Sequence, residues 1–327
     1  MIAVTGASGL LGSFVVKQLH DQAVSFVAIK RENSDTHLVG DLPVDWRAAD
    51  ILDITALCLV LNGVDTVIHT AALVSFNPRD REKLYQVNVE GTRNVVNACL
   101  RTGVKRLLHV SSVAALGRKK ETLEVDEESK WQDSALNSDY AESKYLAELE
   151  VCRGREEGLQ IDIINPSIIL APANWNNSSA QLFKYVWEEK PFYTEGLLNY
   201  VDVRDVVKVI GDLLANTQPG GGRFIVNGGT ISSRELLTKM AHRLGKRPPR
   251  IKVARTLLFV LAWLESIRSW LASNQPLISS QSIRASQDKF YFSNKKAVDK
   301  LKMKFTPLDE TLDWCCAYYR EKNNSNR

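Results

Sequence analysis

Three glycines just behind the first apolar run constrain the fold of this chain more than any other feature. The run at residues 2–4 leads into Thr5, Gly6, Ala7, Ser8, Gly9, Leu10, Leu11 and Gly12, and an amphipathic stretch follows. Gly6 permits a tight turn, Gly9 leaves room for backbone N–H groups to approach a pyrophosphate, and Gly12 lets a helix pack closely on its strand. The order of strand, turn and helix therefore predicts that dinucleotide phosphates bind at the helix N-terminus.

The composition is that of a folded globular protein. The chain has 327 residues, 44% of them hydrophobic, which is enough for one large domain or two. The first apolar run starts at Ile2, with no basic or cleavable segment before it, which predicts a cytoplasmic protein without a secretory signal. The net charge of +4 is spread among 38 acidic residues and does not indicate nucleic-acid binding. The scattered cysteines and histidines predict reduced thiols and no metal site.

Short apolar runs alternate with helical periods along much of the chain. Residues 24–29, 66–69, 106–110 and 161–164 are predicted to be buried strands, and residues 81–100 a helix that Gly103 ends. This alternation predicts an α/β fold, a doubly wound parallel sheet (Rossmann fold) with a smaller, mostly helical lobe. We expect residues 1–165 to form the sheet domain, with core elements added by residues of about 200–228, and residues 166–327 to form mainly the lobe.

Residues 253–271 are the most hydrophobic stretch of the sequence. Arg255, Glu265 and Arg268 interrupt it, and its longest uncharged run, residues 256–264, is too short to span a bilayer. Three interpretations stay open: a helix packed on the second lobe, a lid over the active site, or a helix lying on a membrane surface. The hydrophobic pattern does not separate them.

A serine, a tyrosine and a lysine are spaced so that the predicted sheet brings them together. Ser111 and Ser112 end the apolar run at 107–110, and Tyr140 and Lys144 follow near the start of a later helical segment. Tyr140 and Lys144 are four residues apart and therefore lie on one helix face. The same spacing recurs twice near the C-terminus, but only this pair follows a strand ending in serine and precedes another core strand. This order places all three groups at the carboxyl ends of the sheet.

Together these motifs resemble those of an extended short-chain dehydrogenase/reductase of the NAD-dependent epimerase/dehydratase superfamily. The resemblance covers nearly the whole chain. It includes the turn at 5–12, Ala49-Asp50-Ile51, His69-Thr70-Ala71-Ala72, Asn88-Val89-Glu90-Gly91-Thr92, the Ser112, Tyr140 and Lys144 triad, and Asn165-Pro166-Ser167. It implies an NAD(P)-dependent enzyme that acts on a small-molecule substrate, with residues 1–165 as the NAD(P)-binding domain. A homodimer formed through the helices at 81–100 and 140–151 is also implied.

The resemblance assigns a role to each motif. Asp50 and Ile51 would flank the adenine, and Ala71 and Ala72 would line the cofactor phosphate and ribose. Asn88 would either support the central helix or join the hydrogen bonds of the active site. The remaining implied cofactor contacts are Gly6, Ser8, Gly9, Leu10, Leu11, Gly12, Thr70, Tyr140, Lys144, Asn165, Pro166, Ser167 and Ile168.

The chemistry of hydride transfer explains the triad. A carbonyl oxygen that accepts a hydride on its carbon gains negative charge and must receive a proton, and Tyr140 would be the general acid. A free phenol has a pKa of about 10, so we expect Lys144, as a neighbouring cation, to lower the pKa of Tyr140. Lys144 would also bond the nicotinamide ribose. Ser112 would donate to the developing oxyanion, a contact worth about 3 kcal/mol in other enzymes. Ser111 is the nearby alternative.

The choice between the two cofactors depends on the end of the second predicted strand. An acidic residue there would accept a hydrogen bond from the ribose 2′-OH of NAD, whereas a cation suits the 2′-phosphate of NADP. Lys30 and Arg31 therefore predict NADP. Glu32 follows at once, so NAD stays the alternative.

The later part of the chain narrows the branch of the family. Nucleotide-sugar epimerases and dehydratases usually carry an arginine shortly before the region at 200–203, but residues 196–199 are Gly-Leu-Leu-Asn. Residues 165–205 and 288–297 are more similar to dihydroflavonol reductase-like and 3β-hydroxysteroid dehydrogenase-like members. We therefore predict a reductase of a ketone, or a dehydrogenase of a secondary alcohol, on a bulky small molecule. The alternatives are a nucleotide-sugar epimerase/dehydratase and a non-catalytic scaffold that senses dinucleotides.

Overall fold

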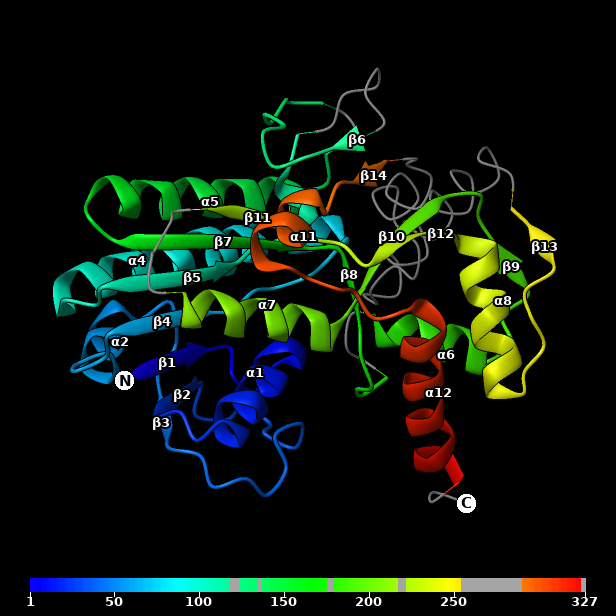
Figure 1. Ribbon diagram of the computed structural model, residues 1–327, viewed down its shortest axis with the longest axis horizontal. Helices are drawn as coiled ribbons and strands as arrows, with labels where there is room; N and C mark the ends of the chain where they lie inside the picture. The colour runs from blue at the N-terminus through cyan, green and yellow to red at the C-terminus, as the bar shows by residue number, and fades with distance from the viewer. Residues whose placement is uncertain (118–123, 135–136, 176–178, 217–221, 254–289, 325–327) are drawn as a thin grey trace.

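The computed structural model describes residues 1–117, 124–134, 137–175, 179–216, 222–253 and 290–324 (Figure 1). Its larger part is built on a seven-stranded parallel sheet with the order β11-β7-β5-β4-β1-β2-β3. The strands are β1 (Ile2–Thr5), β2 (Phe26–Lys30), β3 (Trp46–Ala48), β4 (Thr66–His69), β5 (Arg106–Val110), β7 (Gln160–Pro166) and β11 (Arg223–Val226). The strand order reverses between β1 and β4, so their carboxyl ends flank the crevice in which such sheets bind ligands.

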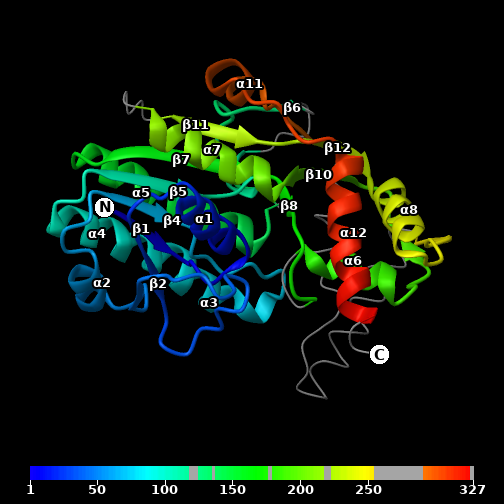
Figure 2. The same cartoon turned by 60° about the horizontal axis from the view of Figure 1, so that its bottom comes forward.

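Helices cover both faces of the sheet, which confirms the doubly wound α/β fold. On one face α1 (Leu10–Asp21) packs against α7 (Val203–Ala215), and on the other α4 (Gly91–Thr102) packs against α2 (Ile54–Val60) and α5 (Asp139–Glu156) (Figures 1 and 2). Successive strand residues point to opposite faces, so Leu108 joins the core under α1 and α7 while Leu107 joins the core under α4 and α5.

The helix predicted at 81–100 is present but interrupted. It begins as α3 (Arg81–Leu84), continues as the π-helical segment η2 (Tyr85–Glu90) and ends as α4. Gly103 ends it in the left-handed region with φ 75°, as predicted. The period of the sequence does not reveal the π-helical turn, because the buried positions Leu84, Asn88, Thr92, Val95 and Cys99 keep spacings of three or four residues through it. Two short 3₁₀ helices, η1 (Pro78–Asp80) and η3 (Val113–Ala115), lie near the carboxyl ends of the strands.

A smaller lobe follows β7 and extends beyond the carboxyl ends of the sheet (Figure 1). A three-stranded sheet of β8 (Ile168–Leu170), β10 (Leu197–Asp202) and β12 (Gly229–Ser232) connects to the helices α6 (Ala180–Trp187), α8 (Ser233–Leu244) and α12 (Leu308–Asn324). Phe183 and Tyr319 lie in its core with rings 4.9 Å apart. The lobe also holds the strand pair β9 (Phe192–Tyr193) and β13 (Ile251–Lys252).

Late segments of the chain return to the sheet. The helix α11 (Lys295–Leu301) packs on β11 and α7, and β14 (Tyr291–Phe292) pairs with β6 (Glu124–Val125). Of the hydrophobic segment at 253–271, residues 254–271 lie outside the described residues, as do 288–289, so the three interpretations of that segment stay open. Among the helices that the structure describes, none is long and apolar enough to cross a membrane.

Candidate active site

The glycine-rich turn has the geometry that a bound phosphate needs. Gly6 adopts a φ of +69°, and a Cβ there would lie 2.6 Å from the backbone nitrogen of Ala71. A Cβ on Gly12 would lie 2.1 Å from the carbonyl oxygen of Gly6, so only glycine fits at both places. Gly9 is the N-cap of α1 and provides no side-chain cap, and the first helical turn holds no acidic residue. The backbone N–H groups at this helix end therefore suit an anion.

A pocket of about 540 Å³ lies beyond β2 and β3, where the adenosine end of a dinucleotide is expected. Its lining residues are Arg31, Glu32, Asn33, Ser34, Ala48, Ala49, Asp50 and Ala56. Lys30 does not line it: the Lys30 ammonium lies 5.9 Å from the ring centre of Trp46 and donates to the carbonyl oxygen of Glu32 at 3.3 Å. Lys30 is the last residue of β2 and Arg31 is the first residue beyond it, and only Arg31 lines the pocket.

The other predicted cofactor contacts gather at the same edge of the sheet. Asp50 accepts a hydrogen bond of 2.9 Å from the backbone of Leu52, and Ile51 lies close to Gly91, where a Cβ would come within 2.5 Å of it. The Thr70 hydroxyl donates to the carbonyl oxygen of Thr5 at 2.7 Å. Ala71 and Ala72 follow directly, so the turn after β4 faces the turn after β1. These placements fit a dinucleotide lying across the carboxyl ends of β1, β2 and β4.

Ser112, Tyr140 and Lys144 meet at the end of β5. Ser138 caps α5 by accepting a hydrogen bond from the backbone of Ala141, which starts the helix just before Tyr140. The Ser112 side chain lies close enough to the Tyr140 hydroxyl to lower the pKa of Tyr140. Lys144 is 2% exposed, and its ammonium donates to the carbonyl oxygen of Val110 at 3.0 Å. The structure thus brings Ser112 and Tyr140 together and places Lys144, one helical turn beyond Tyr140, against the end of β5.

The pKa values of this group follow from burial. Burial lowers the pKa of Lys144 from 10.5 to about 8, although the charge of Glu148 opposes that effect. Burial also raises the pKa of Tyr140, and the hydrogen bond from Ser112 only partly offsets it. The expectation of a lowered pKa for Tyr140 is therefore wrong for the protein alone, because loss of solvent outweighs the neighbouring polar groups.

Ser111 is placed differently from its neighbour. Its backbone nitrogen donates to the carbonyl oxygen of Ile164 at 2.7 Å, which continues the ladder between β5 and β7. Its buried hydroxyl has no hydrogen-bond partner among the described residues, whereas the Ser112 hydroxyl reaches Tyr140. The geometry favours Ser112 over Ser111 as the serine of the triad.

Asn88 fastens the loop after β4 to α5. Its amide oxygen accepts from the backbone of Leu73 at 2.7 Å, and its amide nitrogen donates to the carbonyl oxygen of Leu73 at 3.0 Å and to the Ser143 hydroxyl at 2.9 Å. The side chain is 1% exposed. It therefore acts by fixing two neighbours of the site, in line with the supporting role that was one of its two expected roles.

The segment after β7 contributes mainly through Asn165. The Asn165 amide donates to the Ser112 carbonyl oxygen at 2.9 Å. Pro166 is buried at the end of β7, the backbone of Ser167 donates to the carbonyl oxygen of Val226 at 3.1 Å, and Ile168 begins β8. These residues carry the chain from the sheet into the lobe.

Sequence reasoning missed three features of this site. They are Glu148, Phe76 and the packing of His69 against His109 close to Lys144, with the two imidazole rings 5.3 Å apart. The position of Glu148 four residues after Lys144 is the one signal that could have identified it. Within the described part of the chain, no three histidine, cysteine, aspartate or glutamate side chains are arranged to hold a metal ion.

Comparisons with known proteins agree with this architecture. Residues 2–227 match the model of the NAD dependent epimerase/dehydratase family. The chain is 30% identical over 318 residues (94% of this chain, 91% of the relative) to a Synechocystis sp. protein provisionally named a dihydroflavonol 4-reductase. It is also 30% identical over 288 residues (86% of each chain) to sterol demethylase protein B of Methylococcus capsulatus.

A solved structure agrees over almost the full length. The crystal structure of gox2253 covers 98% of both chains with a TM-score of 0.83 and 28% identity. The family model and the relatives carry the family assignment, and the solved structure shares the fold. The chain therefore belongs to the NAD-dependent epimerase/dehydratase family, as an NAD(P)-dependent oxidoreductase of the extended short-chain dehydrogenase/reductase type.

Proposed function

We propose that this protein is an NADP-dependent reductase of a ketone, or dehydrogenase of the corresponding secondary alcohol, on a bulky and largely apolar small molecule. The observation that carries the proposal is the approach of Ser112 to Tyr140 at the end of β5, where the buried Lys144 ammonium is bonded to the Val110 carbonyl oxygen. Two hydroxyl donors next to a buried cation suit a carbonyl oxygen that gains negative charge. A homodimer and a cytoplasmic location belong to the same proposal.

Arg31 supports NADP as the preferred cofactor. Its side chain is exposed and lines the pocket beyond β2 together with Asn33 and Ser34, which add polar groups. A guanidinium can form two parallel hydrogen bonds to a phosphate, and nothing comparable is needed for the 2′-OH of NAD. Glu32 also lines this pocket, so Arg31 and Glu32 are the two residues whose balance sets the preference.

An apolar loop beside Tyr140 supports the substrate class. Val74 is 45% exposed and Phe76 is 36% exposed, and the Phe76 ring meets the Tyr140 ring edge-on at 5.8 Å. Asn88 holds both backbone groups of Leu73, which fixes the start of this loop. Exposed apolar side chains on a fixed loop next to a polar centre suit a bulky ring system. The names of the two relatives refer to a dihydroflavonol and a sterol.

The residues divide the chemistry as follows. A bound nicotinamide dinucleotide supplies the hydride, or accepts it in the reverse direction. Ser112 donates a hydrogen bond to the carbonyl oxygen, and Tyr140 transfers its phenolic proton to that oxygen as negative charge develops. The protonated ammonium of Lys144 stabilises the phenolate that remains on Tyr140. Because Lys144 is buried, water screens this attraction little.

The decisive experiment replaces the proton donor. We expect Tyr140→Phe to lower kcat by about 10²–10⁴-fold on every ketone that the wild type reduces, since a general acid contributes that much. The control is Tyr145→Phe, because Tyr145 stacks on Trp131 with parallel rings at 4.5 Å and phenylalanine preserves that contact. NADPH binding, followed by tryptophan fluorescence, should be similar in both variants. Turnover that survives Tyr140→Phe on all active substrates would end this proposal.

A further inference from the structure

A buried acid one helical turn beyond Lys144 has no part in the chemistry above. Glu148 lies on α5 and its side chain is 1% exposed. One carboxylate oxygen accepts a hydrogen bond of 2.6 Å from the Asn165 amide nitrogen, and the other is paired with the Arg223 guanidinium. Burying a carboxylate is costly unless it is paired and hydrogen-bonded, and these contacts meet both needs.

Asn165 connects this acid to the serine of the triad. Its amide nitrogen donates one hydrogen to Glu148 and the other to the Ser112 carbonyl oxygen at 2.9 Å. Both neighbours are acceptors, so the nitrogen and not the oxygen of the amide must face them. Glu148 thereby fixes the orientation of Asn165, and Asn165 holds the backbone of the residue whose hydroxyl meets Tyr140.

Glu148 therefore completes a ring of contacts that connects α5 with the end of β5. Tyr140, Lys144 and Glu148 follow at intervals of four residues along one face of α5, whereas Ser112 follows β5. The distance between the hydroxyl groups of Ser112 and Tyr140 depends on how the end of β5 sits against the helix. The bonds from Glu148 through Asn165 to Ser112 fix that placement.

The charge of Glu148 also acts on Lys144. Burial lowers the pKa of Lys144 to about 8, and the nearby carboxylate counteracts this. From the sheet, His69 on β4 and His109 on β5 face the ammonium; burial and the charge of Lys144 lower the pKa of His69 to about 3 and that of His109 well below its usual value. Both imidazoles are thus neutral near pH 7 and add no charge next to the Lys144 ammonium.

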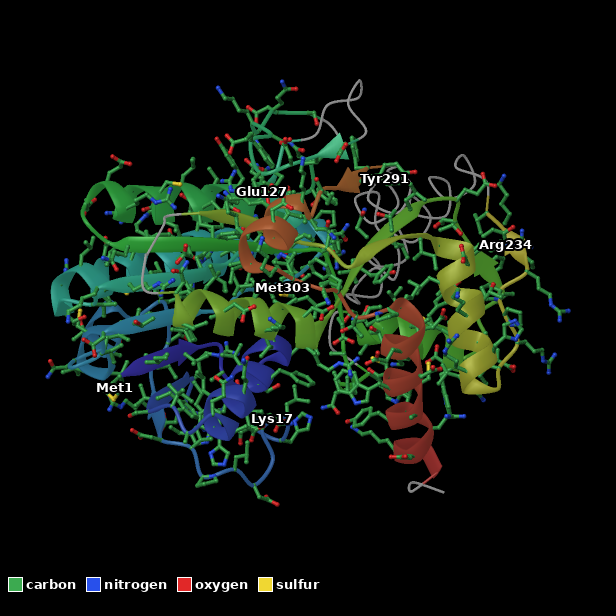
Figure 3. All side chains as sticks on the ribbon, viewed as in Figure 1. Met1, Lys17, Glu127, Arg234, Tyr291 and Met303 are labelled. Atoms are coloured by element: carbon green, nitrogen blue, oxygen red, sulfur yellow. The ribbon has the colours of Figure 1, made fainter. Side chains whose placement is uncertain are left out.

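The opposite side of the carboxylate is also fixed. Arg223 on β11 donates to the Glu127 carbonyl oxygen at 3.4 Å, and the Glu127 side chain accepts from the backbone of Ile225 at 2.9 Å; Figure 3 shows Glu127 near β11. Arg223 is therefore held from outside while it binds Glu148. The carboxylate is thus paired with Arg223 and interacts electrostatically with Lys144.

We propose that Glu148 is a positioning residue of the reaction: it sets Ser112 against Tyr140 through Asn165 and compensates the buried charge of Lys144. The inference rests on the proposed function, because it concerns the same three residues. Glu148 touches neither substrate nor cofactor in this scheme and acts through Asn165 and Lys144.

The test compares Glu148→Gln with Glu150→Gln. Glu150 lies on the same helix and pairs with Arg93 at 3.0 Å and Arg153 at 2.9 Å, so it controls for the loss of an ion-paired carboxylate. We expect Glu148→Gln to lower kcat by about tenfold to a hundredfold, with the KM for the ketone and the Kd for NADPH within about threefold of the wild type. The alkaline limb of the kcat profile should move to lower pH by about one unit. Glu150→Gln should change none of these.

Asn165→Ala separates the two roles. It breaks the link to Ser112 but leaves the charge of Glu148, so kcat should fall while the alkaline limb keeps its place. If Glu148→Gln matches Glu150→Gln in kcat and pH profile while Tyr140→Phe is inactive, the inference is overturned and the proposed function stands. An active Tyr140→Phe overturns both. Should circular dichroism show Glu148→Gln unfolded, a wild-type kcat for Asn165→Ala overturns the inference.

Discussion

Arg31 and Lys30 are adjacent cations with different surroundings, which makes them a matched pair for testing the cofactor preference. Arg31 lines the pocket, whereas Lys30 lies over Trp46. A hydrogen bond to a charged group contributes about 1.5–3 kcal/mol, so loss of a guanidinium that binds the 2′-phosphate should weaken NADPH binding by about tenfold to a hundredfold. Lys30→Ala removes a charge only at longer range, where solvent screens it, and should weaken binding less than about threefold.

Quenching of tryptophan fluorescence measures both variants. The chain has seven tryptophans, and titrations with NADPH and with NADH at fixed salt give four dissociation constants to compare with the wild type. For Arg31→Ala we expect the loss with NADPH alone, because NADH has no 2′-phosphate. Equal effects of the two substitutions, or an equal loss with NADH and NADPH, would show that Arg31 acts by general charge and refute the reasoning. A wild type that prefers NADH would transfer the role to Glu32.

Three further predictions concern the turn, the loop and the triad. Gly12→Ala should abolish dinucleotide binding, because its Cβ would lie 2.1 Å from the Gly6 carbonyl oxygen. Gly103→Ala, at φ +75° in open space, should lower the free energy of unfolding by about 1 kcal/mol and leave binding intact. Urea denaturation and cofactor titrations measure both effects. Asn88→Ala should lower stability by about 1–3 kcal/mol and raise the KM for the ketone more than it lowers kcat, since Leu73 loses both bonds. The rate of ketone reduction should fall as pH rises through about 8, where Lys144 loses its proton, and a flat profile from pH 7 to 9 would contradict the role of its charge.

Local patterns predicted the sheet and the turn, because the constraints there are local. The strands follow from short apolar runs, and the glycines from a turn that admits no Cβ at Gly6 or Gly12. The order of motifs along a parallel sheet also sufficed to bring Ser112, Tyr140 and Lys144 to one edge. What the motif order could not do was choose between adjacent residues, since Ser111 and Ser112 differ by which face of the sheet each side chain meets.

The sequence pattern does not predict which residues from distant segments contact each other. Asn165 contacts Glu148 from 17 positions away, and Arg223 contacts it from 75 positions away. The low pKa of His69 and the raised pKa of Tyr140 also depend on burial by several elements at once. A charged residue on a helix is usually exposed to solvent, so the sequence pattern does not indicate that Glu148 of α5 is buried.

The same layer lets stability and activity be separated. Lys144→Met removes a buried cation, while Glu148 keeps Arg223 and Asn165 as partners, so the free energy of unfolding at pH 7 should be unchanged or higher although activity is lost. Glu148→Met leaves the buried Lys144 and the partly exposed Arg223 without their shared counter-charge and should lower the free energy of unfolding by about 3–5 kcal/mol.

The buried charge of Lys144 also determines how the free energy of unfolding changes with pH. Burial lowers the pKa of Lys144 from 10.5 to about 8, so between these values the folded protein binds fewer protons than the unfolded chain. The free energy of unfolding from this residue must therefore rise with pH across that window. Urea denaturation of the wild type and of Lys144→Met at pH 7 and pH 10 measures the difference. If both proteins gained or lost the same stability between the two pH values, Lys144 would not carry a buried charge, and neither its role beside Tyr140 nor its dependence on Glu148 would survive.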